Sequence, residues 1–350
     1  MKGLEIPKST ALPTSRRDDL VTVALATWLI AGLLIDGYAH SNIIEDEESF
    51  FTIWHAVFYS GFLATTGWVF LLIRRNLKPG RSWLQAIPPG YHTAAVGIVV
   101  FAAGGIGDGI WHTLLGVETS LDALLSPTHL LLFMGGLMIV TSPYLATLQR
   151  GRMERPEWSV FLVPFLSILL ATSLVAFFFA YLWGPAETSW YKAVYNPATN
   201  FGEFTVAGGI AAMLTAVIIS TTPLVLILRR WHPPAGTFTI LWGFLGLFIA
   251  IVFDRDSIAF AAGLAGGLAA DLLVGWLDAG SHRPMATRVV AFTAPIVLAS
   301  AFFLILRSEV RWQAELWGGA IFFSGLAGLA LDLLVGKRES VVPQPSREAD

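Results

Sequence analysis

Long apolar runs alternate with short polar segments along most of the chain. A helix of about 20 mostly apolar residues can cross the hydrocarbon core of a bilayer, and ten runs approach or reach that length, the seventh and ninth being short. They cover residues 20–41, 51–73, 92–115, 123–147, 158–183, 204–228, 237–253, 257–277, 289–306 and 314–336. The pattern predicts an all-α fold, a polytopic transmembrane helix bundle of about ten helices.

The polar segments predict the domain organisation. Residues 1–19 form a polar N-terminal tail, and the first apolar run lacks a small-residue cleavage site, so we expect a retained helix and not a signal peptide. Residues 20–147 form a four-helix unit, and residues 158–336 form the six-helix remainder of the bundle. The composition of residues 337–350 is typical of a disordered tail.

Positive charge marks every second connection. Eighteen of the 22 Lys and Arg residues lie in the N-terminal tail, in alternate connections and in the C-terminal tail. With ten crossings all of these segments lie on one side, which the positive-inside rule identifies as cytoplasmic. The sequence therefore predicts a multi-pass protein of the inner or plasma membrane, with both termini in the cytoplasm and the lipid bilayer as its main partner.

Composition narrows the possible chemistry. With 55% hydrophobic and 13% charged residues and a mean hydropathy of +0.65, the chain has more apolar surface than a soluble core of its length can bury. The net charge is −3 and no continuous basic face is present, which excludes nucleic acid as a partner. Because the chain has no cysteine, a bound metal needs His, Asp or Glu ligands.

Two internal similarities stand out. DGYAH at residues 36–40 corresponds to DGIWH at 108–112, and the next apolar runs, which contain IWHAVFYSG and PTHLLLFMGG, each carry a histidine near their start. The first two predicted helices, 20–41 and 51–73, are therefore predicted to be a copy of the next two, 92–115 and 123–147, in the same orientation. GLAADLLVG at 267–275 and GLALDLLVG at 328–336 differ at one position, which relates the eighth and tenth apolar runs, 257–277 and 314–336.

The first similarity carries the candidate metal ligands. An Asp and a His four residues apart share one helix face, and by the predicted topology both pairs end their helices at the extracytoplasmic side, where the following helices begin. The six candidates in this layer are Asp36, His40, His55, Asp108, His112 and His129. They suit a divalent transition metal such as Cu, Fe or Zn, in one centre or two. The alternative is a set of Asp–His hydrogen bonds without metal.

Three other acids are candidates for further roles. Glu118, in the short loop after His112, is a candidate general base or additional ligand. Asp271 and Asp332 lie within helices rich in Gly and Ala, where they either form a polar bond between closely packed helices or act as an ion or proton relay.

One local resemblance concerns the first ligand set. Asp36, His40 and His55 resemble the DxxxH plus downstream His metal site in the C subunit of the particulate methane and ammonia monooxygenases, although the last histidine follows at a longer interval here. The resemblance implies copper or a related metal near the membrane surface. DGYAH with IWHAVFYSG is also similar to segments of uncharacterised bacterial polytopic membrane proteins.

Three functions fit the sequence. The first is a metal-dependent membrane oxidase, hydroxylase or hydrolase that acts on a small or lipid-like substrate. The second is a metal-ion or proton-coupled transporter, and the third is a structural or assembly subunit. Transporter sites usually lie near the bilayer midplane, whereas the six candidate ligands are predicted near one surface, which favours the enzyme.

Overall fold

A computed structural model describes residues 11–42, 51–116, 121–151, 153–194, 200–255 and 257–335. Within these residues, nine helices are long and apolar enough to cross a membrane, and the seventh predicted run forms a shorter apolar helix of 16 residues. The prediction of an all-α, polytopic helical membrane protein is therefore confirmed.

The long helices follow the ten predicted runs. They are α1 (Arg16–Asn42), α2 (Ile53–Asn76), α4 (His92–Leu115), α6 (Pro127–Val140) with α7 (Ser142–Leu148), α8 (Trp158–Phe178), α10 (Asn200–Arg230), α11 (Thr237–Val252), α12 (Ile258–Leu277), α13 (Pro284–Ile305) and α14 (Ala314–Leu334). Short helices lie in the connections: α3 (Trp83–Ala86), α5 (Leu121–Leu125), the 3-10 turn η1 (Ala180–Leu182) and α9 (Ser189–Lys192).

Some helix boundaries differ from the predicted runs for local reasons. Helix α1 begins at Arg16, because the Ser15 hydroxyl accepts a hydrogen bond from the backbone of Asp18 while the Asp18 carboxylate accepts one from the backbone of Ser15. Helix α13 begins at Pro284, since proline is well suited to the first turn. The fourth run breaks before Ser142–Pro143, where the Ser167 hydroxyl donates to the Val140 carbonyl over 2.5 Å.

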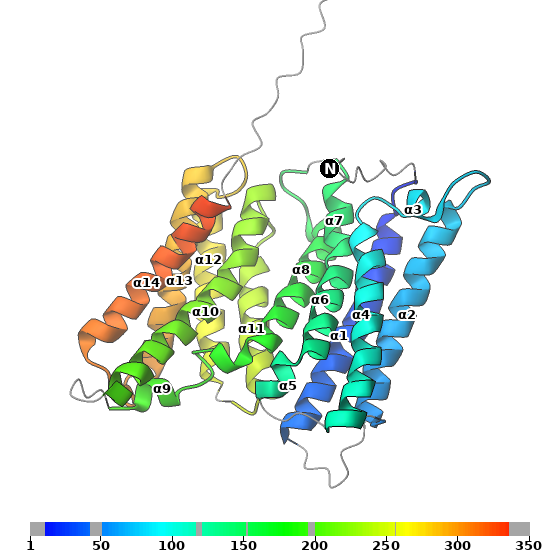
Figure 1. Ribbon diagram of the computed structural model, residues 1–350. Coiled ribbons are helices and arrows are strands. Elements are labelled where there is room, and N and C mark those ends of the chain that lie inside the picture. The colour runs from blue at the N-terminus through cyan, green and yellow to red at the C-terminus, as the bar shows by residue number, and fades with distance from the viewer. Residues whose placement is uncertain are drawn as a thin grey trace, which may run out of the picture.

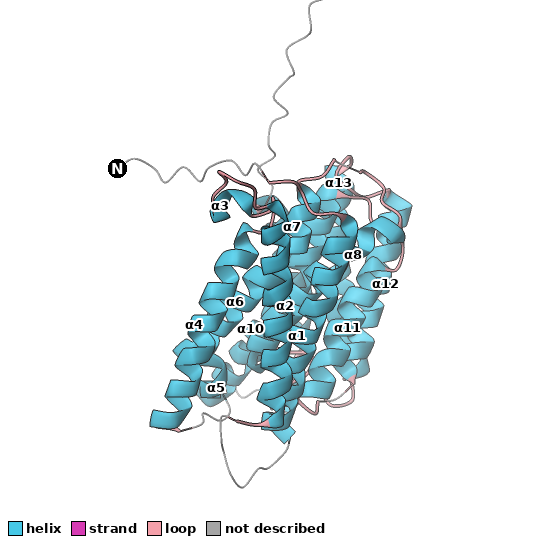
Figure 2. Cartoon of the chain, turned by 90° about the vertical axis from the view of Figure 1, so that its right-hand side faces the viewer, coloured by secondary structure: helices cyan, strands magenta, loops and turns pink. Residues whose placement is uncertain are grey.

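Helix α8 lies in the middle of the bundle (Figure 1). It is buried along most of its length and contacts α1, α6 and α7 as well as α10 and α11. Helices α1, α2, α4 and α6 lie on one side of α8, and α10, α12, α13 and α14 lie on the other. Figure 2 shows the helices running between two ends at which the connections gather.

The two ends of the bundle differ in chemistry. At the upper end in Figure 1, the connections from α2 to α4, from α7 to α8, from α10 to α11 and from α12 to α13 carry most of the basic loop residues. We call this end the basic end. Helices α1 and α4 finish at the opposite end, where α2 and α6 begin, and we call this the site end. The assignment of the basic end to the cytoplasm stays a prediction.

Glycines bring two helix pairs into close contact in equivalent ways. A Cβ on Gly61 of α2 would lie 2.7 Å from the backbone of Leu29 on α1, and one on Gly135 of α6 would lie 2.6 Å from the backbone nitrogen of Phe101 on α4. Phe101 follows Leu29 by the same interval that separates the two Asp-His pairs. The pairs α1–α2 and α4–α6 thus pack alike, while a duplication as their origin stays a prediction.

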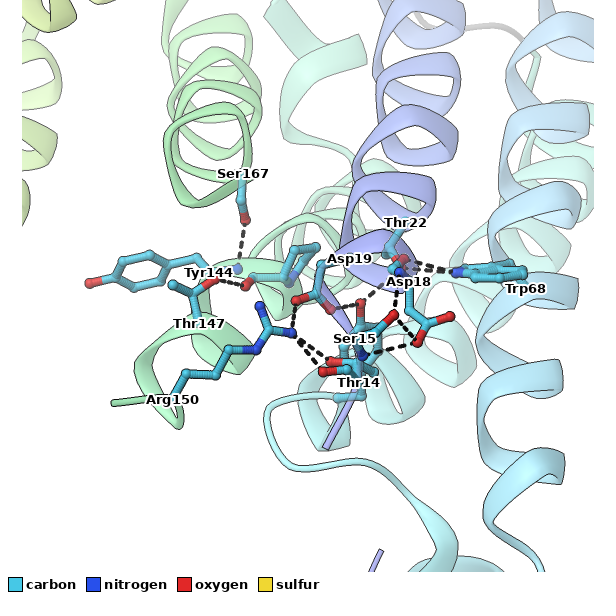
Figure 3. Close-up of polar contacts among 12 residues, drawn as sticks. Thr14, Ser15, Asp18, Asp19, Thr22, Trp68, Tyr144, Thr147, Arg150 and Ser167 are labelled. Atoms are coloured by element: carbon cyan, nitrogen blue, oxygen red, sulfur yellow. Dashed lines mark hydrogen bonds and ion pairs between the residues drawn. The ribbon is translucent and has the colours of Figure 1, made fainter. Parts of the chain in front are cut away.

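A polar network at the basic end joins α1 and α2 to the residues just before α4 and just after α7 (Figure 3). Asp19 of α1 is fully buried, pairs with Arg150 after α7 and accepts a hydrogen bond of 2.8 Å from Tyr91, which precedes α4. Thr22 lies 2.8 Å from the Tyr91 hydroxyl and accepts a hydrogen bond from Trp68 of α2. Burial, and then the charge of Asp19, raise the pKa of Tyr91 well above its ordinary value, so its hydroxyl stays protonated.

Candidate metal centre

The first group of candidate ligands comes from the end of α1 and the start of α2. Asp36 and His40 lie one turn apart on α1, and Nε2 of His40 is 3.7 Å from Oδ1 of Asp36. Nε2 of His55 is 3.7 Å from the other carboxylate oxygen, Oδ2. One ligand atom from each residue lies within 4.8 Å of the others, so the three can hold a metal ion. We call them the first trio.

The second group is the equivalent set from α4 and α6. Nε2 of His112 lies 3.5 Å from Oδ1 of Asp108, and Nε2 of His129 lies 3.2 Å from the same oxygen. Their ligand atoms also lie within 4.8 Å of one another. We call Asp108, His112 and His129 the second trio. Each trio therefore offers two imidazoles and one carboxylate.

The third member of each trio is held by a helix-capping hydroxyl. Thr52 caps α2: its Oγ1 accepts the backbone N–H of His55 and lies 3.0 Å from Nδ1 of the same ring. Ser126 caps α6 in the same way and lies 2.9 Å from Nδ1 of His129. When Nδ1 donates its proton to the hydroxyl, Nε2 keeps its lone pair for a metal. Each cap thus orients a ligand as well as starting a helix.

The two trios are neighbours. The ring centroids of His55 and His112, which belong to different trios, lie 6.3 Å apart. Within the trios, the centroids of His40 and His55 are 5.4 Å apart and those of His112 and His129 are 5.9 Å apart. The four imidazoles form a row across α1, α2, α4 and α6, so the structure brings all six predicted ligands together.

The trios differ in exposure and in hydrogen bonding. In the first trio the His40 side chain is 43% exposed, whereas in the second trio the His112 side chain is only 5% exposed. Asp108 is almost completely buried and accepts a hydrogen bond of 3.0 Å from Thr128. At the position equivalent to Thr128 the first trio has Trp54, which has no hydroxyl. The first trio is therefore the more open of the two.

Two residues beside the trios shape the site. A Cβ on Gly37 would lie 2.5 Å from the ring of Phe177, so the glycine after Asp36 allows α8 to pack against the end of α1. The Tyr59 ring lies 6.3 Å from the His55 ring and interacts electrostatically with the carboxylates of both trios. Tyr59 is therefore close to both trios.

Other predicted acids are not brought to the trios by the described structure. Glu118, the candidate general base, lies outside the described residues. The role of Glu118 stays a prediction.

Asp271 caps another helix. Its carboxylate on α12 accepts hydrogen bonds from the backbone N–H groups of Phe238 and Thr239, at 3.1 and 2.9 Å, and from the Thr239 hydroxyl at 2.7 Å. These groups form the first turn of α11, whose own N-cap residue is Gly236 and has no side chain to donate or accept. Asp271 therefore satisfies backbone donors that α11 cannot satisfy itself.

Asp332 is an ion-pair partner of two arginines. Oδ1 lies 3.0 Å from Arg229 of α10 and Oδ2 lies 3.5 Å from Arg288 of α13. The carboxylate thus joins α14 to two neighbouring helices near the basic end. The relay proposed for Asp271 and Asp332 stays a prediction, and the contacts observed for both are those of structural residues.

Several residues around the site were not identified from the sequence. Thr52 and Ser126 each precede a ligand histidine by three residues and stand near the start of a predicted run, directly before the residues that form α2 and α6, which is the position of an N-cap. That signal was present and repeated. Thr128 gave no such signal, because its hydrogen bond to Asp108 joins two helices.

Comparison of the chain with protein-family models, with curated protein sequences and with solved structures finds no match. The described residues form a membrane-spanning helical protein with two Asp/His groups that can hold a metal ion.

Proposed function

We propose that this protein is a metal-dependent membrane enzyme in which each trio binds one divalent transition-metal ion at the site end of the bundle. The observation that carries the proposal is the convergence of two groups of one Asp and two His, with His55 and His112 side by side. Buried ionisable groups within a membrane-spanning unit are costly, and a bound cation would offset that cost by pairing with each carboxylate.

The donor set supports metal chemistry. Two imidazoles and one carboxylate leave coordination positions open for substrate or water, as in non-haem iron oxygenases and in some zinc hydrolases. Bound at such a position, the metal would supply Lewis-acid or redox chemistry. The identity of the metal separates the two reaction classes, because zinc has no redox chemistry whereas iron and copper do.

The difference between the trios supports a division of roles. The exposed His40 makes the first trio accessible from outside the bundle, so we assign substrate contact to this trio. In the second trio Asp108 and the His112 side chain are almost completely buried, the His129 side chain is 21% exposed, and Thr128 fixes the carboxylate. We assign to this trio a tightly held ion that keeps α4 and α6 in place beside the first trio.

The interior of this helix unit favours an enzyme over a metal transporter. Helices α1, α2, α4 and α6 meet around an apolar cluster that offers no ligand to a moving ion. Its buried members are Leu29, Phe58, Phe62, Phe101, Leu132 and Ile139. Asp271 and Asp332 are engaged by other helices nearer the basic end.

Metal content tests the proposal directly. We expect protein purified without added chelator to contain about two transition-metal ions per chain by mass spectrometry of the elements, since each trio is a complete ligand set. The double variant His40→Ala with His112→Ala, which removes one imidazole from each trio, should lose most of this metal. His92→Ala is the matched control, because His92 lies on the same helix as His112 but at the basic end.

Two outcomes would overturn the proposal. Metal content that is the same in the wild type and in the double variant would leave Asp–His hydrogen bonding as the better account of the trios. Metal uptake into proteoliposomes that depends on the trios, and on Asp271 or Asp332, would instead identify a transporter. The control His92→Ala should retain its metal. The control and the double variant should also elute as the same folded species, so that loss of metal from the double variant is not due to unfolding.

A further inference from the structure

An apolar groove runs along the outside of the bundle beside the trios. It has a volume of about 610 Å³ and lies between α2 and α4. Most of its lining side chains are aliphatic or aromatic, and the lining also includes Gly105, Gly109 and Thr113. The aliphatic side chains along its edge are exposed, including Leu63, Ile106 and Leu114. In a membrane-spanning protein these residues face lipid, so the groove is open to the hydrocarbon core.

The groove reaches the candidate metal centre at one end. Tyr59 lines the groove and also lies beside His55. Gly109 and Thr113 line it as well, and they directly follow Asp108 and His112 in the chain. A Cβ on Gly105 would lie 2.9 Å from the Tyr59 ring, so glycine at this position leaves room for the tyrosine between groove and site.

The groove lies along the part of α4 nearest the site end and does not extend over the whole helix. On α4 its lining runs from Phe101 to Leu114, which at about 1.5 Å per helical residue corresponds to about 20 Å. The hydrocarbon core is about 30 Å thick, so one leaflet contributes about 15 Å. The groove is therefore long enough for one leaflet but too short to cross both, and its volume falls within the range of about 300–1,000 Å³ typical of ligand sites.

We infer that this groove binds one alkyl chain of a membrane amphiphile, with the polar head of that molecule at the trios and the terminal methyl near Phe101. The chain-binding part of the inference stands on the groove alone, while placement of the head at a reacting centre rests on the proposed function. The enzyme then acts on the head or on the adjoining atoms of a single-leaflet amphiphile, and the end of the alkyl chain lies away from the metal.

Photo-cross-linking of the metal-free protein tests chain binding. The chelator-treated protein is reconstituted in phosphatidylcholine vesicles that contain phosphatidylcholine with a diazirine on one acyl chain, placed either near the carboxyl end or near the terminal methyl. After illumination, labelled residues are located by peptide mass spectrometry. The near-carboxyl probe should label the region of Ile110 to Leu114, and the terminal probe should label Leu63 and Ala102.

Two neighbouring alanines of α4 provide the matched variants. Ala102 lines the groove, whereas Ala103 is exposed on the helix but does not line it. Ala102→Trp should fill the groove and abolish preferential labelling there, while Ala103→Trp should leave it unchanged. Thermal unfolding of both variants, followed by circular dichroism, verifies that each still folds.

The inference is overturned if label is spread evenly over the lipid-facing helices, or if the two tryptophan variants lose label equally while remaining folded. Labels placed in the reverse order along the groove would overturn the orientation. Because the protein is metal-free throughout, loss of the proposed metal sites would leave these results unaffected. Metal binding without preferential labelling would rule out alkyl-chain binding in the groove and leave the proposed function intact.

Discussion

The rings of His55 and His112 lie with their centroids 6.3 Å apart, although the two histidines belong to different helix pairs. His55 is close enough to interact electrostatically with Asp108, His112 and His129 as well as with His40. The two trios therefore form one continuous polar cluster in an otherwise apolar unit.

The difference in exposure between the trios predicts two rates of metal release. With excess EDTA, the ion held by the first trio, which contains the exposed His40, should leave faster than the ion held by the less exposed second trio. The amount of metal bound to the protein should therefore fall with time in two phases, one fast and one slow. Asp36→Ala should remove the fast phase and Asp108→Ala the slow one. A single phase that accounts for both ions, or the reverse assignment, would contradict the proposed division of roles.

The capping hydroxyls should control metal affinity. Loss of a hydrogen bond that orients a ligand typically weakens metal binding by about 10–100-fold, and we expect this range for Thr52→Val and for Ser126→Ala. Competition with a coloured chelator measures the affinity. Thr66→Val is a matched control on α2, far along the helix from the site. Equal affinities in all three variants would show that the hydroxyls serve only as helix caps.

Packing of α1 against α2 should depend on one glycine and not on another. A Cβ at Gly61 meets the Leu29 backbone at 2.7 Å and cannot be accommodated by a side-chain movement, whereas Gly67 has nothing within 4 Å of that position. Gly61→Ala should destabilise the protein by about 1–3 kcal/mol. Gly67→Ala should be neutral or stabilising by up to about 1 kcal/mol. Thermal unfolding in detergent distinguishes them, and an equal effect would contradict the observed packing.

Asp271 should stabilise the start of α11. Asp271→Ala removes all three hydrogen bonds to Phe238 and Thr239 and should cost about 0.5–2 kcal/mol, the range for loss of a helix cap. Asp271→Asn keeps an acceptor and should cost less. The measurement is chemical or thermal unfolding. Unchanged stability in Asp271→Ala, together with loss of ion or proton movement in proteoliposomes, would favour the relay instead.

The buried ion pair between Asp19 and Arg150 should contribute more to stability than the exposed ion pair between Arg155 and Asp278. Arg150→Met leaves the carboxylate of Asp19 buried without the positive charge that pairs with it, and breaking a buried ion pair in this way typically costs about 3–5 kcal/mol. Arg155→Met removes an exposed ion pair with Asp278 and should cost less than about 1 kcal/mol. Adding Asp19→Asn to Arg150→Met should restore part of the loss. Equal unfolding temperatures for Arg150→Met and Arg155→Met would contradict this.

The sequence by itself determined the helices and part of the site. An apolar run of sufficient length forms a helix in lipid because no water is available to satisfy an open backbone, so the crossing segments follow from composition. An Asp and a His four residues apart must share a helix face, which placed Asp36 with His40 and Asp108 with His112. The shorter length of α11 was also visible in the sequence.

Only the tertiary structure decided which helix faces meet. It brought His55 beside His112, placed Asp271 at the start of α11 and joined Asp19 to Arg150, a partner 131 residues away. Helix periodicity fixes neighbours within one or two turns, whereas contacts between helices depend on how closely their backbones approach and on which polar groups need partners. In this bundle, glycines such as Gly61 and Gly135 allow neighbouring helix backbones to come close together. Buried polar groups on one helix then bind partners on another.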